Sequence, residues 1–370
     1  MPRRPRLSPA VFQLPIEKMR DGYYSDVYFQ RAREIMVADD YAPRVRMQVF
    51  QRNTAVLCGI DEALAILRLC SGRYQDGVWK DGWDQLTVRA LWDGDALAPF
   101  ETVMFVEGDY SLFAHLETCY LGVLTRRTRI ATNARAIVDA ADGKDVLFFP
   151  ARFDHHLVQT GDGYAAYISG ALGVSTDANA EWWGSRGMGT VPHSLIAAYG
   201  GNTILATEKF AEYIAPSVNV IALVDFDNDC VGTSLAVARR LGQRLYGVRL
   251  DTSQTLVDNS IFPQMGTFPP TGVNPQLVRN VRDALDAEGF RHVKIVVSGG
   301  FNAEKIHAFE SLRVPVDAYA VGSAFFDGSG EFDFTADIVA LEVDGAWREC
   351  HKVGRPERPN PRLEQVPVDY

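Results

Sequence analysis

Cysteine is scarce in this 370-residue chain, and its five cysteines are widely scattered. They are Cys58, Cys70, Cys119, Cys230 and Cys350, and no two of them form a Cys-x-x-Cys pair. An odd number of scattered thiols excludes a disulfide framework and a cysteine zinc site, and it indicates reduced thiols that mostly fill the core. Long apolar runs are lacking too, since none approaches the roughly 18 residues of a membrane-spanning helix. No apolar stretch follows the basic start, so we expect no secretory signal and a cytoplasmic location.

Positive charge is in the minority. The chain has 37 Lys and Arg residues against 47 Asp and Glu residues, which gives a net charge of −10. An acidic protein does not generally gather on nucleic acid or on an anionic membrane, so neither is an expected partner. Several catalytic motifs are also missing: the Gly-x-x-x-x-Gly-Lys-Ser/Thr phosphate loop, His-Glu-x-x-His, Gly-x-Ser-x-Gly, and a Gly-x-Gly-x-x-Gly helix opening.

The first part of the chain mixes strands with helices. Segments with strand character are 44–50, 85–91 and 99–106, and segments with helical periodicity are 32–36 and 62–69. They follow no regular strand–helix alternation, which is typical of an α+β domain. Residues 115–141 have the pattern of a long helix or a helical pair. Residues 331–370 do not continue the strand–helix alternation of the region before them, so we expect residues 1–115 and 331–370 to form one domain.

Residues 116–330 have a different sequence pattern, in which short apolar runs each end in a polar or glycine-rich cluster. The runs and their clusters are 218–224 with Asp225, 245–250 with Asp251, 293–297 with Ser298–Gly300, and 316–321 with Gly322–Ser323. The first and last intervals fit single strand–helix units of about 25–30 residues. The middle interval adds a Pro- and Gly-rich insertion within 254–275, and residues 145–149 could be a further strand. Continuous apolar runs indicate a parallel sheet. We therefore predict an α/β fold, with an incomplete TIM-like barrel beside the α+β domain.

The two glycine clusters follow consecutive predicted strands. In a barrel the C-terminal strand ends converge on one face, where sites are built. Glycine lets backbone N–H groups approach a phosphate, and the start of the next helix adds about half a positive charge. The clusters therefore predict a phosphate-binding site, and the alternative is that their glycines only close tight turns.

Two aspartates, Asp225 and Asp251, end the other two runs. Carboxylates at these positions can hold Mg²⁺, which bridges phosphate oxygens, or they can bind sugar hydroxyls. Residues 225–229 resemble the start of an EF-hand loop, but Cys230 and Ala236 stand where that loop needs Gly and Glu, which excludes calcium. The alternative role for either aspartate is to cap the helix that follows.

Histidine is scarce as well, with seven in the chain. His193 precedes an apolar helical run, and with an ordinary pKa of about 6.5 it would be a neutral nucleophile or base at physiological pH. Its alternative role is a helix cap or a packing residue. Arg152 follows the strand at 145–149 and suits a carboxylate clamp. The adjacent His155 and His156 point in different directions on most backbones, which argues against a shared metal.

Six short motifs occur in an order that resembles a known family. They are Ser25–Phe29, Val106–Tyr110 with Leu116–Thr118, Gly189–Ile196, Val248–Thr252, Val296–Gly300 and Ala320–Ser323. Together they resemble nicotinate phosphoribosyltransferase, of the type II phosphoribosyltransferase family, over nearly the whole chain. The resemblance implies an enzyme of NAD biosynthesis that joins nicotinate to 5-phosphoribosyl-1-pyrophosphate and releases nicotinate mononucleotide and pyrophosphate. In this family ATP hydrolysis drives the reaction through a phosphorylated histidine.

The resemblance also implies a role for each candidate residue. His193 matches the phosphorylated histidine, Asp251 is a second catalytic candidate, and Asp225 with Asp251 would bind Mg²⁺. Tyr28 matches an aromatic ring that stacks on the pyridine, with Asp26 beside it from a neighbouring subunit, which implies a homo-oligomer with a shared active site. The other substrate-binding positions are Arg152, Thr190, Ser194, Arg249, Thr252, Ser298, Gly299, Gly300, Gly322 and Ser323. The implied cofactor is Mg²⁺, and the implied partners are nicotinate, 5-phosphoribosyl-1-pyrophosphate and ATP.

The chain departs from the family in places, and other functions stay open. Members often show paired arginines where only Arg152 stands here, and the insertion at 262–275 and the acidic loop 225–229 also differ. A quinolinate phosphoribosyltransferase would need no phosphohistidine but more basic residues. A barrel lyase or isomerase would need a catalytic lysine, and Lys294 lies before the core of its strand. A non-catalytic nucleotide-binding protein would leave His193 unexplained.

Overall fold

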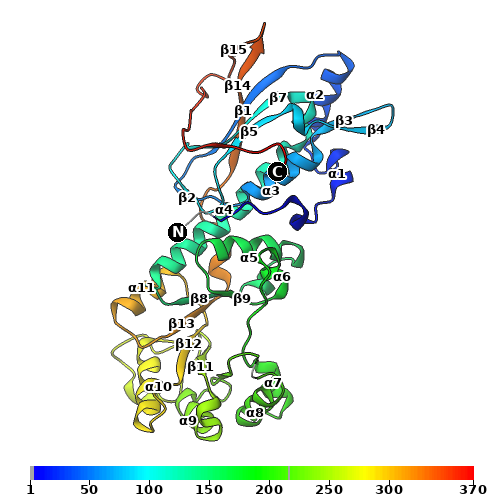
Figure 1. The fold of residues 1–370 in the computed structure, drawn as a ribbon. Helices are drawn as coiled ribbons and strands as arrows, with labels where there is room; N and C mark the ends of the chain where they lie inside the picture. Colours follow the sequence, from blue (N-terminus) through cyan, green and yellow to red (C-terminus); the bar gives the residue numbers. More distant parts are fainter. Residues whose placement is uncertain (1–3, 216) are drawn as a thin grey trace. The chain divides into compact units, whose positions relative to one another are not determined.

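The computed structural model describes residues 4–215 and 217–370, and the chain divides into two units (Figure 1). Unit 1 runs from the start of the chain to Thr132 and from Gly328 to Tyr370, and unit 2 runs from Asn133 to Asp327. The first division therefore falls within the long helix α4 (Glu117–Ala140). The sequence prediction had put the divisions at residues 115/116 and 330/331.

Unit 1 is built on a six-stranded antiparallel sheet. In order across the sheet its strands are β15 (Ala346–Glu349), β14 (Phe334–Val343), β1 (Arg44–Gln51), β7 (Thr102–Asp109), β5 (Thr87–Ala90) and β16 (Glu364–Gln365). Its two-stranded pairs are β2 (Ala55–Val56) with β6 (Ala96–Leu97), and β3 (Gly72–Gln75) with β4 (Val78–Asp81). The tail strand β14 pairs with β1 in the middle of the sheet. The predicted α+β domain, completed by the C-terminal tail, is thus confirmed.

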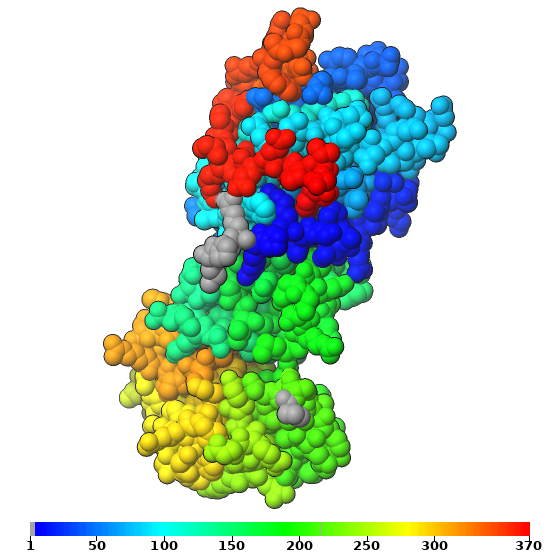
Figure 2. Space-filling model, in the orientation of Figure 1, coloured from blue at the N-terminus to red at the C-terminus, as the bar shows by residue number. Residues whose placement is uncertain are grey.

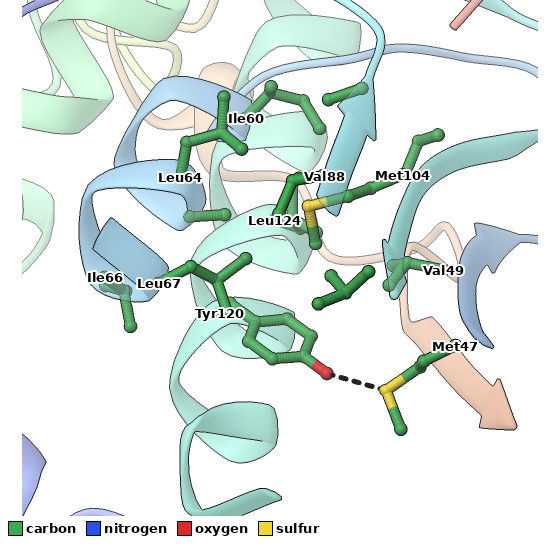
Figure 3. Close-up of a cluster of buried hydrophobic side chains, with 14 of the residues drawn as sticks. Met47, Val49, Ile60, Leu64, Ile66, Leu67, Val88, Met104, Tyr120 and Leu124 are labelled. Carbon is green, nitrogen blue, oxygen red and sulfur yellow. Dashed lines mark hydrogen bonds between the residues drawn. The ribbon is translucent and has the colours of Figure 1, made fainter. Parts of the chain in front are cut away.

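Helices α3 (Ile60–Cys70) and α4 supply much of the core of unit 1. Apolar side chains from α3, α4 and strands β1, β5 and β7 form one buried cluster, shown in part in Figure 3. The hydroxyl of Tyr120 on α4 donates to the sulfur of Met47 on β1 at 3.2 Å, so even the polar end of this buried ring has a partner. The other helices of the unit are α1 (Ile16–Arg20) and α2 (Val27–Ala38).

Unit 2 is built on a six-stranded parallel sheet. In order its strands are β10 (Ile221–Leu223), β11 (Gly247–Leu250), β12 (Lys294–Val297), β13 (Ala318–Val321), β8 (Asp145–Phe148) and β9 (Gly173–Val174). Within unit 2 the last strand in sequence, β13, pairs with the first, β8, as a barrel requires, and β9 and β10 are the two edges of the sheet. The predicted incomplete TIM-like barrel is confirmed. Helices α9 (Cys230–Leu241), α10 (Pro275–Ala287) and α11 (Ala303–Ser311) follow β10, β11 and β12, and α9 lies beside α10 (Figure 1).

An irregular segment, Met188–Val191, stands between the two edge strands of unit 2. The Met188 N–H donates to the Val174 carbonyl of β9 at 2.7 Å, and the Val191 N–H donates to the Ile221 carbonyl of β10 at 3.3 Å. The Val191 side chain is buried against Leu223 and against the two helices that follow, α7 (His193–Ala198) and α8 (Thr203–Tyr213). This bridging segment partly closes the barrel and leads directly into His193. Helices α5 (Gln159–Ile168) and α6 (Asp177–Ala180) precede it.

The two chain ends meet in unit 1. The hydroxyl of Tyr370 donates to the carbonyl oxygens of Leu7 and Asp61 at 2.9 and 3.0 Å, and Figure 2 shows the red C-terminal residues against the blue N-terminal ones. All five cysteines are free, and three of them are buried, as the sequence indicated. Among the described residues no helix has the length and apolar character to cross a membrane.

Candidate active site

A cavity of about 580 Å³ opens at the C-terminal ends of the unit 2 strands. Ten of the predicted site residues line it, although they are far apart in sequence: Arg152, His193, Ser194, Arg249, Asp251, Ser298, Gly299, Gly300, Gly322 and Ser323. They come together because parallel strands end on the same edge of the sheet. The loops after β8, β11, β12 and β13 and the start of α7 thus share one mouth.

The ends of β11 and β12 are tied together at the floor of this cavity. The Ser298 hydroxyl donates to Asp251 Oδ1 at 2.8 Å, and the Ser298 N–H donates to the Leu250 carbonyl at 2.9 Å. Beyond Ser298 the backbone turns through Gly299 and Gly300, with φ of +86° and +71°. These values lie in the left-handed region that glycine enters without strain, so the loop can present its backbone to a ligand.

His193 and Asp225 form a pair beside the cavity. His193 begins α7, and its Nε2 atom lies 3.0 and 3.1 Å from the two carboxylate oxygens of Asp225, which follows β10. The hydrogen bond to Asp225 raises the pKa of His193, while partial burial opposes this. The imidazole is 45% exposed and the carboxylate 9%, so the ring is open to a ligand while its partner is enclosed.

Arg249 is a partly buried cation in the wall of the same cavity. Its Nε atom is buried and has no hydrogen-bond partner within the described part of the chain. Burial lowers the pKa of Arg249, and Arg152 adds to this effect, whereas Asp251 and Asp225 oppose it. A partly buried guanidinium that lacks a hydrogen-bond partner at Nε is costly, so the cavity suits an anionic ligand that would pair with its charge.

Five predicted residues do not line the cavity. Thr252 is buried and lies 3.5 Å from the Cys230 sulfur, and Thr190 belongs to the bridging segment. Asp26 and Tyr28 belong to unit 1, where the Thr118 hydroxyl donates to Asp26 Oδ2 at 2.9 Å and Tyr28 is 62% exposed at the start of α2. Asp225 does not line the cavity either, but it contacts His193.

Sequence reasoning missed several lining residues, among them Phe149, Phe153, Ser175 and Phe301. Phe153 lies against Gly322, where an added Cβ atom would come within 2.9 Å of the ring and would make the ring shift. Phe149 directly follows β8 and could have been found by its place at a strand end, whereas Phe153 and Phe301 lie further along their loops. Ser175 follows β9, which is only two residues long and leaves no clear apolar run.

Two carboxylates are available for Mg²⁺. Asp225 and Asp251 follow the neighbouring strands β10 and β11, and they are already bonded to His193 and Ser298. No cluster of three metal-ligating side chains exists among residues 4–215 and 217–370. Because Mg²⁺ is often held by one or two carboxylates together with substrate phosphates and water, the pair fits an ion that arrives with substrate.

Comparison with known proteins decides the family. The quinolinate phosphoribosyl transferase N-terminal domain family matches residues 26–128, which lie in unit 1. The solved structure of nicotinate-nucleotide pyrophosphorylase from Pyrococcus furiosus is 31% identical, covers 96% of this chain and 86% of its own, and has a TM-score of 0.76. The chain belongs to the type II phosphoribosyltransferase family. It is therefore a member of an enzyme family, and its barrel mouth is the candidate active site.

Two further relatives of this type II phosphoribosyltransferase are informative. Nicotinate phosphoribosyltransferase pncB1 of Mycobacterium tuberculosis is 30% identical over 258 residues, which are 68% of this chain and 53% of that protein. The chain thus spans about half the length of the curated relative it matches. The crystal structure of human nicotinic acid phosphoribosyltransferase has a TM-score of 0.64 at 17% identity, covers 90% of this chain and 77% of its own, and supports the fold.

Proposed function

We propose that this protein is a nicotinate phosphoribosyltransferase of NAD salvage. It would join nicotinate to 5-phosphoribosyl-1-pyrophosphate and release nicotinate mononucleotide and pyrophosphate. The observation that carries the proposal is Arg249, a partly buried cation whose Nε atom has no hydrogen-bond partner among the described residues, in a cavity that also holds two glycine loops and His193. A polyanionic sugar phosphate would supply the negative charge that Arg249 and the glycine loops can bind.

The residues fit the demands of the reaction. When pyrophosphate leaves the anomeric carbon, positive charge builds on the sugar and negative charge on the leaving group. Arg249 would stabilise the leaving group, and the Asp251 carboxylate would face the developing positive charge. Asp225 and Asp251 would hold Mg²⁺, which neutralises phosphate charge when bound. The loops at Gly299 and Gly322 would receive the phosphate of the substrate through backbone N–H groups.

We further propose that ATP is a co-substrate and that His193 is phosphorylated. With Nε2 hydrogen-bonded to Asp225, the neutral ring carries its proton there and leaves the Nδ1 lone pair free. Nδ1 would attack the γ-phosphorus of ATP as the bond to the ADP oxygen breaks. Water would later cleave the N–P bond and release inorganic phosphate. Asp225 would stabilise the positive charge that the ring acquires.

Nicotinate is the favoured base because it has one carboxylate, which the Arg152 guanidinium would bind. Arg152 is exposed at the cavity, with Phe149 and Phe153 beside it as apolar surface for a pyridine ring. Quinolinate carries a second carboxylate, for which the lining offers Arg249 alone in addition to Arg152. Quinolinate remains the second candidate because the family that matches residues 26–128 is named for it.

A second copy of the chain is the proposed partner of α2 in a homo-oligomer. Within its own unit α2 has no buried residue. Large apolar side chains are exposed on it and on its flanks, namely Tyr23, Tyr24, Val27, Tyr28, Ile35, Val37 and Tyr41. A surface of this kind marks an interface. We also propose that the protein acts in the cytoplasm, where its free thiols, Cys350 exposed among them, would stay reduced.

The deciding experiment is product formation by the purified protein with Mg²⁺ and 5-phosphoribosyl-1-pyrophosphate. Nicotinate, nicotinamide and quinolinate are offered separately, each with and without ATP. We expect nicotinate mononucleotide in an amount that rises with ATP. Turnover of quinolinate alone would move the protein to the sister activity, and no product from any base would refute the transferase proposal.

A further inference from the structure

A second cavity adjoins the candidate active site within unit 2. Its volume is about 520 Å³, and it shares Gly300, Phe301 and Ser323 with the first cavity. The remaining walls come from α4, from the start of α11 and from Gln254, a residue of the insertion after β11. The two glycine loops therefore stand between the two cavities, and a ligand held by them can reach both.

The amide of Gln254 occupies the space beside Gly300. A Cβ atom added to Gly300 would lie 1.5 Å from Gln254 Nε2, so the amide sits where any larger residue would place its side chain. The backbone of Gln254 lies close to Gly272, where an added Cβ atom would come within 3.2 Å of the Gln254 Cα. Both glycines have positive φ, of +71° and +67°. The insertion is thus shaped to set this one side chain on the glycine loop.

The Gln254 amide has no hydrogen-bond partner among the described residues. Two nearby polar side chains form hydrogen bonds with other groups. Asn302 Oδ1 accepts from the Lys305 backbone N–H at 2.9 Å, and the Lys305 ammonium donates to the Gly299 carbonyl at 3.4 Å. Glu304 and Asp327 are the carboxylates in the walls of this cavity. The Gln254 NH₂ group is therefore a neutral donor without a protein partner in the described part of the chain, and it lies against the glycine loop that is predicted to bind phosphate.

We propose that Gln254 is a further substrate-binding residue, whose Nε2 donates to the 5′-phosphate of the substrate where the glycine loops meet the second cavity. The inference rests on the proposed function, since it assumes a phosphoribosyl substrate. A neutral donor suits a site with carboxylates in its walls, because it adds a hydrogen bond to phosphate without pairing with those carboxylates. A glutamate of the same shape would place a negative charge against the phosphate.

The test uses Gln254→Ala and Gln254→Glu in the full-length protein. A hydrogen bond to a charged group is worth roughly a tenfold change in affinity, so we expect KM for 5-phosphoribosyl-1-pyrophosphate to rise about tenfold in Gln254→Ala and further in Gln254→Glu. The inhibition constant of ribose 5-phosphate should also rise in both variants. The inhibition constant of pyrophosphate and the KM for nicotinate should stay unchanged. The matched control is Gln243→Glu, which adds the same charge to an exposed residue of a different cavity of unit 2.

The outcomes separate this inference from the proposed function. Wild-type protein that neither turns over nor binds ribose 5-phosphate would overturn both. Active wild-type protein with unchanged ribose 5-phosphate inhibition in both Gln254 variants would overturn the role of Gln254 alone. Equal losses for ribose 5-phosphate and pyrophosphate would also overturn it, because a general disturbance of the loop would then explain the effect.

Discussion

The imidazole Nε2 of His193 lies within hydrogen-bonding distance of both carboxylate oxygens of Asp225, at 3.0 and 3.1 Å. Asp225 directly follows β10, and His193 comes two residues after Val191, whose N–H donates to the Ile221 carbonyl of β10. The pair therefore depends on the way in which the barrel is closed. It also fixes which ring nitrogen is free for chemistry.

Replacing His193 by Asn is expected to abolish stimulation by ATP, because the nucleophilic nitrogen is lost. Turnover with ATP should fall by about 100-fold or more, as is typical when a nucleophile or base is removed. The measurement is nicotinate mononucleotide formation with and without ATP, together with detection of phosphohistidine by mass spectrometry. His292→Asn, at the other cavity that holds Gln243, serves as the control. ATP stimulation that survives in the His193 variant would refute the phosphohistidine assignment.

Replacing Asp225 by Asn is expected to reduce phosphorylation of His193 while leaving the protein folded. The amide keeps the shape of the carboxylate but removes the charge that supports a cationic ring. We expect the rate of phosphohistidine formation to fall about tenfold or more. Asp227→Asn, in the same loop, is the comparison. An unchanged rate in Asp225→Asn would show that the pair has no part in the transfer.

Replacing Arg249 by Met should separate stability from activity. The variant loses the cation for the leaving group, so KM for 5-phosphoribosyl-1-pyrophosphate should rise at least tenfold. The free energy of unfolding without ligand should rise by about 1 kcal/mol, because a partly buried charge whose Nε atom lacks a partner among the described residues is removed. Urea denaturation measures the second effect, and the exposed Arg291→Met is its control. A destabilised, fully active variant would contradict this interpretation.

Glu117 predicts how stability changes with pH. Burial raises its pKa from 4.5 to about 8, with Asp337 and Asp26 adding to the effect. The folded state then holds a proton that the unfolded state has lost, so between pH 4.5 and 8 this group makes stability fall as pH rises. The slope is at most about 1.4 kcal/mol per pH unit. Glu117→Gln should flatten that part of the profile, as measured by urea denaturation at several pH values. An unchanged profile would show that Glu117 is ionised in the folded protein.

The exposed face of α2 predicts an oligomer. Ile35→Glu places a charge on that face, and we expect it to shift the protein towards monomer in analytical ultracentrifugation. Val353→Glu, at a residue that is 95% exposed outside the patch, should leave the distribution unchanged. A wild-type monomer at all concentrations would rule out this interface.

The sequence predicted the main elements of both units because their signals are local. The apolar runs ending at Asp225 and Asp251 became β10 and β11, and the segment 145–149 contains β8. Convergence of strand ends then followed from general barrel geometry. His193 was found by its motif, but its pairing with Asp225 was not predicted.

What the sequence could not predict depends on contacts between distant residues. The role of Gln254 is visible only against Gly300, across a strand and a helix. Thr252 stands beside Asp251, yet it turns to Cys230 and is buried. The bridging segment lacks the sequence pattern of a strand. It is not a strand in the structure either, since it donates one backbone hydrogen bond to Val174 of one edge strand and one to Ile221 of the other.

The pairing of β1 with β14 has a consequence for synthesis of the protein. Arg44 on β1 and Glu342 on β14 form a salt bridge although they are 298 residues apart, and all of unit 2 lies between them. At about 5–20 residues per second, β1 waits roughly 15–60 s on the ribosome for this neighbour. The barrel leaves the exit tunnel before the domain that was begun first can be finished. During that interval the edge of β1 that later pairs with β14 is free, and it can pair with a strand of another chain.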